Sequence, residues 1–253
     1  MIEVWGDTLL SSDWHVLHRN IYWFLPEQRA ALSGAEHPDR MSAEEFMAAE
    51  CATYRRVLER VEELLASPAP VRRFLFLGDL VFGLNRPSGT ASLVETLRRD
   101  LPAFFDIFRI LRAASVQRVL VLGNHDDFKL RSRVARALYE ELFDEIVLFV
   151  RDDQTLFTHF PIGYSRATDA TRGTPHEKYY RMHKSFHKLD ARLLDECASA
   201  PLVNFHGHIH VGPFLYPVAN IAYRNVALDV LSSRGRPHVD GATASSIAGS
   251  YVG

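Results

Sequence analysis

Short apolar runs alternate with longer amphipathic stretches along most of the chain. Apolar runs of strand length predict buried β-strands over residues 8–12, 73–77, 118–122, 146–150, 155–158, 202–205 and 225–231. The amphipathic stretches between them predict helices over residues 42–65, 92–113, 131–142 and 186–198. This alternation is typical of an α/β fold, in which helices cover the faces of the sheets.

Two local signals refine this outline. Residues 42–45 read Ser-Ala-Glu-Glu, a capping box that marks the start of a helix, and apolar residues then recur at helical spacing as far as Leu65. Residues 151–153 read Arg-Asp-Asp between two apolar runs and predict a hairpin turn. We therefore expect at least one antiparallel pair of strands in the sheets.

Length and composition indicate one folded unit. The chain has 253 residues, of which 47% are hydrophobic, so it can bury a sizeable core. Because no linker-like segment divides the chain, we expect a single domain over residues 1–240. Residues 241–253 are dominated by glycine, alanine and serine and are expected to form a C-terminal tail.

Charge and cysteine content narrow the classes of function. A formal net charge of -2 provides no overall basic field, so nucleic acid is not the expected partner. Cys51 and Cys197 are too few for a disulfide framework or a thiolate zinc site. Since the sequence has no signal-like start and no run of about 18 apolar residues, we expect a soluble, cytoplasmic protein without a membrane partner. Nothing in the sequence indicates an oligomeric state.

Polar residues recur at one kind of place, directly after a predicted strand, which is the edge that ligand sites of α/β sheets favour. Their carboxylate, imidazole and amide groups are ligands that mid-series divalent metals accept. Each motif alone has an ordinary explanation, such as a turn, but all of them together predict a metal site. In chain order the motifs are Asp13-Trp14-His15, Gly78-Asp79, Gly123-Asn124-His125-Asp126, His159 and Gly207-His208-Ile209-His210.

This series of motifs resembles the signature of the calcineurin-like metallophosphoesterase family, which runs Asp-x-His, Gly-Asp, Gly-Asn-His-Asp/Glu, His and Gly-His-x-His. The motifs extend over most of the chain. The resemblance implies a sandwich of two mixed β-sheets flanked by helices. It also implies that Asp13, His15 and His210 bind one metal, that Asn124, His159 and His208 bind another, and that Asp79 bridges them.

The resemblance also implies a reaction. Two cations about 3.5–4 Å apart can share a bridging water that is acidic enough to become hydroxide near neutral pH. That hydroxide would hydrolyse a phosphate ester, and His125, the family's catalytic histidine, would protonate the leaving oxygen. Asp126 is either an orienting partner of His125 or a solvated acid after a turn. We expect two divalent ions, with manganese as the first choice and iron, zinc or nickel as alternatives.

The segment 165–192 follows His159 and concentrates positive and aromatic side chains. Insertions between the motifs of the family commonly form a cap over the metals, and a basic aromatic cap would suit a small anionic, nucleotide-like substrate. Lys178, Arg181 and Lys184 are the expected substrate-binding residues. The alternative is a solvated helix face with scattered charge.

Three functions remain open on the sequence. The first is hydrolysis of a small-molecule phosphomonoester or phosphodiester. The second, a nuclease acting on DNA or RNA, is weakened by the net charge and by the lack of a long coiled coil or a basic arm. The third is a non-catalytic interaction module on the same scaffold. That module is expected to have lost metal ligands or the catalytic histidine, whereas every one of these positions is filled here.

For several residues near the motifs, the sequence does not decide whether they belong to the site. His18 and Asn20 either face the site or have no role, and His206 falls outside the family's pattern. Residues 225–231, which include Asp229, are expected to return beneath the site as a structural strand.

Overall fold

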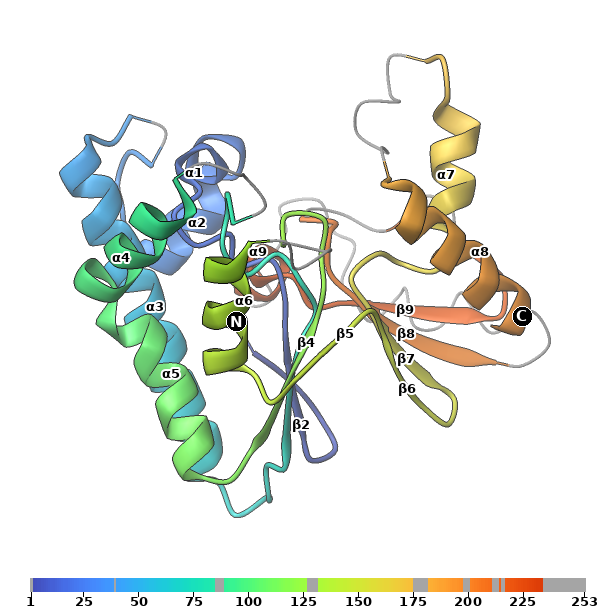
Figure 1. The fold of residues 1–253 in the computed structure, drawn as a ribbon, viewed down its shortest axis with the longest axis horizontal. Coiled ribbons are helices and arrows are strands. Elements are labelled where there is room, and N and C mark those ends of the chain that lie inside the picture. Colours follow the sequence, from blue (N-terminus) through green and yellow to red (C-terminus); the bar gives the residue numbers. More distant parts are fainter. Residues whose placement is uncertain are drawn as a thin grey trace.

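The computed structural model contains two mixed β-sheets, which confirms the predicted fold class (Figure 1). It describes residues 2–38, 40–84, 89–126, 132–174, 182–197, 201–210, 214 and 217–233. The first sheet has five strands in the order β1 (Glu3–Trp5), β2 (Thr8–Ser11), β3 (Arg73–Phe76), β4 (Gln117–Val121) and β5 (Glu145–Val147). The second has four, in the order β6 (Val150–Asp152), β7 (Thr155–Thr158), β8 (Leu202–His206) and β9 (Ile221–Asn225).

Both sheets are parallel except at one edge. Strands β2 to β5 pair in parallel and β1 joins β2 antiparallel, while β7, β8 and β9 pair in parallel and β6 joins β7 antiparallel. The β6–β7 hairpin confirms the turn predicted near residues 151–153, and Asp153 in that turn has a φ of 45°. Because parallel strands all end at the same edge, each sheet brings its carboxyl-terminal loops together.

Helices cover the outer face of each sheet (Figure 1). One group packs beside the first sheet and consists of α1 (Arg19–Phe24), α2 (Pro26–Ser33), α3 (Ala43–Leu65), α4 (Thr90–Asp100), α5 (Pro102–Ala113) and α6 (Arg133–Leu142). Helices α7 (Tyr164–Thr171) and α8 (Lys184–Cys197) lie beside the second sheet. The short helix α9 (Leu228–Ser233) packs against α2. The predicted capping box is present at α3, where Ser42 and Glu45 exchange both hydrogen bonds.

The alternation of side chains along β3 explains why two layers form on the first sheet. Phe74 and Phe76 are fully buried in the cluster that the helices cover. Leu75 and Leu77 are fully buried in a second cluster, which also contains Phe157 from the second sheet. Since full burial of such a side chain contributes about 1.5–3 kcal/mol, the two clusters hold the sheets and helices in one sandwich.

The structure corrects three of the predicted elements. Residues 146–150 are not one strand, because β5 ends in the first sheet and β6 begins in the second. The predicted helix over 92–113 is two helices, since Pro102 restricts the preceding Leu101 to non-helical backbone angles. The predicted strand over 225–231 is wrong: β9 ends at Asn225 and Leu228 begins α9. A short apolar run does not separate a buried strand from a buried helix.

The expected tail over 241–253 lies outside the described residues. Within the described ranges, no helix has both the length and the apolar character needed to cross a membrane.

Candidate metal centre

The five polar motifs lie in loops that leave the carboxyl ends of β2, β3, β4, β7 and β8. Backbone hydrogen bonds join four of these loops in two pairs, and the Asp126 side chain joins the fifth, the loop after β4, to the loop after β3. In the first sheet, the Asp13 N–H donates to the Gly78 carbonyl at 2.9 Å and the His15 N–H donates to the Asp79 carbonyl at 3.0 Å. In the second sheet, the Gly207 N–H donates to the His159 carbonyl at 2.9 Å. The sheets therefore place all five motifs around one region.

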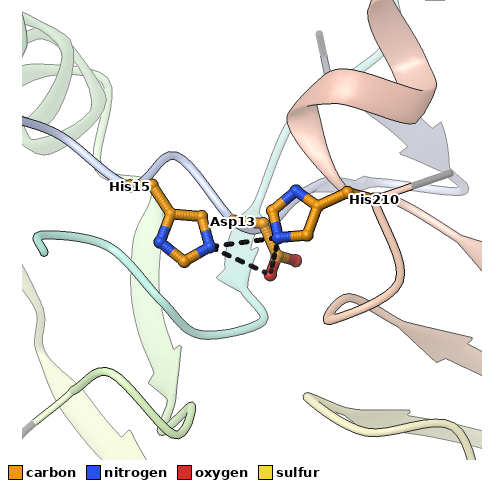
Figure 2. Close-up of side chains that lie close together, drawn as sticks. All are labelled: Asp13, His15 and His210. Atoms are coloured by element: carbon orange, nitrogen blue, oxygen red, sulfur yellow. Dashed lines mark hydrogen bonds and ion pairs between the residues drawn. The ribbon is translucent and has the colours of Figure 1, made fainter. Parts of the chain in front are cut away.

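The first group of side chains is Asp13, His15 and His210 (Figure 2). The two Nε2 atoms of His15 and His210 are 3.1 Å apart. Asp13 Oδ1 is 3.7 Å from His15 Nε2 and 3.6 Å from His210 Nε2. Figure 2 shows the three side chains pointing toward one another, Asp13 and His15 from the loop after β2 and His210 from the loop after β8, so this trio could hold a metal ion.

A second group consists of Asp79, His159 and His208. Asp79 Oδ2 is 3.5 Å from His159 Nε2 and also 3.7 Å from His15 Nε2, so this carboxylate lies within reach of both groups. Asn124 Oδ1 is 2.9 Å from His159 Nε2. The structure thus brings together all seven side chains that the sequence predicts as metal ligands.

The backbone at the centre is strained. Asp13, His15, Asp79 and His208 have φ angles of 56°, 48°, 58° and 63°. This left-handed region is unfavourable for residues with a side chain, at roughly 1–2 kcal/mol each. Such strain persists where the surrounding structure enforces it and is concentrated at functional sites.

Two motif glycines allow the ligand loops to approach each other closely. A Cβ atom on Gly123 would lie 2.2 Å from Asp79 Oδ1. A Cβ atom on Gly207 would lie 2.2 Å from Asp13 Oδ2 and 1.9 Å from Ser12 Oγ. Any side chain at these positions would displace a predicted ligand, so the glycines are needed for space next to the carboxylates.

The electrostatics of the centre fit divalent cations. Burial raises the pKa of Asp13 to about 6 and that of Asp79 to about 7, because a buried carboxylate lacks the solvation that favours its charge. Burial, together with neighbouring imidazoles, holds the pKa of His15 and of His208 well below the usual range. Neutral imidazoles are the form that binds metals, and a bound cation would restore the charged form of the two buried carboxylates.

An unsatisfied atom supports the same conclusion. Among the described residues, Asp13 Oδ1 is buried without a hydrogen-bond partner, although it faces His15 and His210. A buried carboxylate oxygen without a partner is costly unless a cation satisfies it. The residues present therefore fit metal ions.

His125 lies at the edge of the centre. It is half-buried and forms a third group with His15 and Asp79, with its ring centroid 5.2 Å from that of His15. Its backbone N–H donates to Asp79 Oδ1 at 2.7 Å. The side chain is thus close to the predicted ligands, and its catalytic role stays a prediction.

Asp126 is buried and binds backbone groups on two loops. Its carboxylate accepts hydrogen bonds from the N–H groups of Asp79 and Gly123 at 2.9 and 2.8 Å, and from the Tyr139 hydroxyl at 3.0 Å. These contacts hold the loop after β3 against the loop after β4. Because Asp126 is buried, the interpretation of this residue as a solvated acid after a turn is wrong. Its action on the His125 ring stays a prediction.

Much of the segment 165–192 builds the outer layer of the second sheet. Helices α7 and α8 bury Ala167 and Phe186 in one apolar cluster, and Asp190 accepts hydrogen bonds from the N–H groups of Gly163 and Ser165. Lys184 is exposed at the start of α8. Lys178 and Arg181 lie outside the described residues, so their role in substrate binding stays a prediction.

Three residues next to the centre were not assigned to it from the sequence. The Tyr164 hydroxyl is 3.0 Å from His208 Nε2, and Asp229 Oδ2 is 2.8 Å from His210 Nδ1. Arg29 forms an ion pair with Asp229. Asp229 could have been identified from the sequence, because it is an acid inside the apolar run 225–231, and a buried charge needs a partner. No local pattern marks Arg29 or Tyr164.

Comparisons with known proteins assign no family to the chain. It matches no protein-family model and no curated protein. Among solved structures it is similar to a protein of unknown function from Aquifex aeolicus, with 19% identity, a TM-score of 0.47, and coverage of 88% of this chain and 91% of that one. It is also similar to the nuclease MPE of Pseudomonas putida, with 16% identity and a TM-score of 0.35 over 81% of this chain. The chain spans 62% of that nuclease, less than two thirds of its length. Both likenesses are too distant to assign a function.

Proposed function

We propose that this protein hydrolyses a phosphate ester with the help of two divalent cations, as its resemblance to the calcineurin-like metallophosphoesterases implies. The observation that carries the proposal is the position of Asp79. Its Oδ2 lies 3.7 Å from His15 in one group of candidate ligands and 3.5 Å from His159 in the other. A carboxylate shared by two ligand groups is the arrangement that a pair of adjacent cations requires.

Each candidate ligand then has a defined task. Asp13, His15 and His210 hold one cation, and Asn124, His159 and His208 hold the other. Asp79 contributes to both. When bound, such a pair of cations supplies positive charge to the phosphoryl oxygens and makes water acidic enough to attack near neutral pH.

His125 is the proposed proton donor to the leaving oxygen. It is half-buried at the edge of the centre, within 4.8 Å of donor atoms on His15 and Asp79, so it can reach a substrate bound over the metals. General acids contribute about 10²- to 10⁴-fold to rates. Asp126 supports this step by holding the loop that carries His125.

The proposed substrate is a small anionic phosphomonoester or phosphodiester, and manganese is the metal to test first. A formal net charge of -2 favours a small substrate over a nucleic acid, because it provides no extended basic field for a phosphate backbone.

The test combines metal content with a panel of substrates. Protein reconstituted with Mn²⁺ is expected to carry two ions per chain by elemental analysis. It is expected to hydrolyse a chromogenic phosphomonoester or phosphodiester faster than single-stranded DNA, and to lose this activity on chelation. Folded protein that binds one ion or none would contradict the two-cation mechanism, and faster cleavage of DNA would support the nuclease instead.

A His125→Gln variant tests the proposed proton donor. It is expected to keep two ions and lose about 10²- to 10⁴-fold in rate, with a smaller loss for a good leaving group such as nitrophenol. The matched control is His37→Gln, which changes an exposed histidine and is expected to retain full activity. Loss of metal from the His125 variant would show that this residue is a ligand.

A further inference from the structure

One of the candidate ligands, His210, has a charged residue behind it. Its Nδ1 is 2.8 Å from Asp229 Oδ2, and its Nε2 faces the centre, 3.1 Å from His15 Nε2. With Nδ1 as the donor to Asp229, the other nitrogen is left with its lone pair directed at the metal position. A carboxylate behind a ligating histidine fixes the ring's orientation and raises its strength as a ligand.

Asp229 is in turn held by Arg29. Arg29 Nε lies 2.7 Å from Asp229 Oδ1, and Arg29 Nη2 donates to Asp229 Oδ2 at 3.1 Å. The first contact is an ion pair and the second is also a hydrogen bond, so both carboxylate oxygens of Asp229 lie against the guanidinium. Both side chains are fully buried, and they come from α2 and α9, close to opposite ends of the described chain.

The same guanidinium also reaches the first ligand loop. Arg29 Nη1 donates to the carbonyl of Trp14 at 3.2 Å, and Trp14 stands between Asp13 and His15. The Tyr54 hydroxyl donates to that carbonyl as well, at 3.1 Å. Arg29 therefore contacts the loop that carries Asp13 and His15 directly. Through Asp229 it is also linked to His210, the third ligand of the group.

Stability alone does not account for a fully buried ion pair. Removing two charges from water costs several kcal/mol per ion, and apolar residues of similar volume are often equally stable in their place. An ion pair that contacts two ligand-bearing segments has a different use, because its geometry fixes the distance between them.

From these contacts we propose that Arg29 and Asp229 are positioning residues for the metal held by Asp13, His15 and His210. Asp229 orients the His210 ring, and Arg29 fixes both Asp229 and the loop from Asp13 to His15. The inference rests on the proposed metal binding and adds to it a named pair of residues that controls one of the two ions.

The experiment measures the affinity of each metal position by competition with a graded chelator, using Mn²⁺ or Co²⁺ and following bound metal directly. The wild-type protein is expected to hold two ions. Asp229→Ala is expected to weaken one of them about 10- to 100-fold and to leave the other within a few fold of its wild-type affinity. Asp229→Asn keeps a hydrogen-bond acceptor for His210 and is expected to weaken the same ion less.

A matched control separates positioning from general destabilisation. Asn204→Ala also removes a fully buried polar side chain, whose hydrogen bonds go to Ile162, Leu156, Thr158 and Phe205 and to none of the candidate ligands. It is expected to lower the melting temperature yet keep both ions at wild-type affinity. If it loses one ion as Asp229→Ala does, the effect at Asp229 is only structural and the inference fails.

A double variant provides the sharpest readout. If Asp229 acts through His210, then Asp229→Asn should change metal affinity little once His210→Ala is already present, whereas independent effects would add. Additive losses, or two ions bound at wild-type affinity in Asp229→Asn, would overturn the inference. Should Asp229→Ala not fold, the near-isosteric Asn variant decides alone. A wild-type protein that binds no metal would instead contradict the proposed function.

Discussion

The two groups of candidate ligands use the same kinds of side chain but are supported in different ways. Behind the first group, His210 contacts Asp229, which is paired with Arg29 in a fully buried ion pair. Behind the second group, the supports are neutral: His159 Nδ1 is 2.7 Å from the Leu77 carbonyl, and His208 Nε2 is 3.0 Å from the Tyr164 hydroxyl. One group thus depends on charged side chains and the other on the backbone and a hydroxyl.

Topology explains this difference. His159 and His208 leave β7 and β8, which pair directly, with Thr158 opposite His206, so strand register alone brings their loops together. His15 and His210 are 195 residues apart and leave strands of different sheets. Since no strand register joins that pair, additional side chains are needed to hold it.

The largest expected effect comes from removing the residue common to both groups. Asp79→Ala should abolish binding of both ions and reduce activity at least about 10³-fold, because its carboxylate reaches His15 and His159. His15→Ala should mainly weaken one ion. Elemental analysis of both variants distinguishes them, and the surface variant Asp106→Ala serves as a control. Equal losses from Asp79→Ala and His15→Ala would show that the centre is not divided in this way.

In the metal-free protein, acid should affect the stability linked to two nearby histidines in opposite directions: His206 at the end of β8 and His210 in the loop that follows. Burial lowers the pKa of His206 to about 4, so between pH 6.5 and 4 the unfolded chain binds a proton that the folded chain does not. The stability linked to His206 is therefore lost as the pH falls. Burial also opposes the charge of His210, but its hydrogen bond to Asp229 and the charges of Asp13 and Asp229 raise its pKa. The stability linked to His210 is present at low pH and lost as the pH rises.

The measurement is denaturant unfolding of chelator-treated protein at about pH 7 and pH 5. His206→Gln should lose less stability over this interval than the wild type, by about 2 kcal/mol. His37→Gln, an exposed position, should behave as the wild type. If all three proteins lose the same unfolding free energy between pH 7 and pH 5, protonation of His206 does not cause the loss.

The smallest expected effect tests the neutral support of the second group. Tyr164→Phe removes only the hydroxyl that contacts His208 Nε2, so the metal-free protein should lose about 0.5–1.5 kcal/mol of unfolding free energy. The affinity of the ion held by Asp13, His15 and His210 should not change. Denaturant unfolding measures the loss of stability, and chelator competition measures the affinity of that ion. If Tyr164→Phe weakens the ion held by Asp13, His15 and His210, then Tyr164 supports both groups of ligands.

Much of the centre could be predicted because its ligands follow parallel strands. Asp13, Asp79 and Asn124 follow β2, β3 and β4, which pair side by side, so polar residues at those strand ends must meet. The α/β class was predictable because apolar runs and amphipathic stretches alternate, whereas the arrangement in two mixed sheets was expected from the family resemblance.

What could not be predicted depends on contacts between distant residues. Arg29 and Asp229 are 200 positions apart, and neither belongs to a motif. The division of residues 146–150 between two sheets also depends on tertiary packing, because an apolar run alone does not indicate which sheet its residues join. The need for glycine at position 123 also depends on a distant residue, because the missing Cβ makes room for Asp79 from another loop.

The left-handed angles at Asp13, His15, Asp79 and His208 imply a conflict between durability and activity. Glycine adopts these angles freely, so replacing any of the four by glycine would relieve local strain in the metal-free chain while deleting a ligand. A selection for heat resistance alone would therefore favour substitutions that destroy the centre. Directed evolution of this scaffold thus needs a functional screen at every round, because four of its strained positions are those that the proposed chemistry requires.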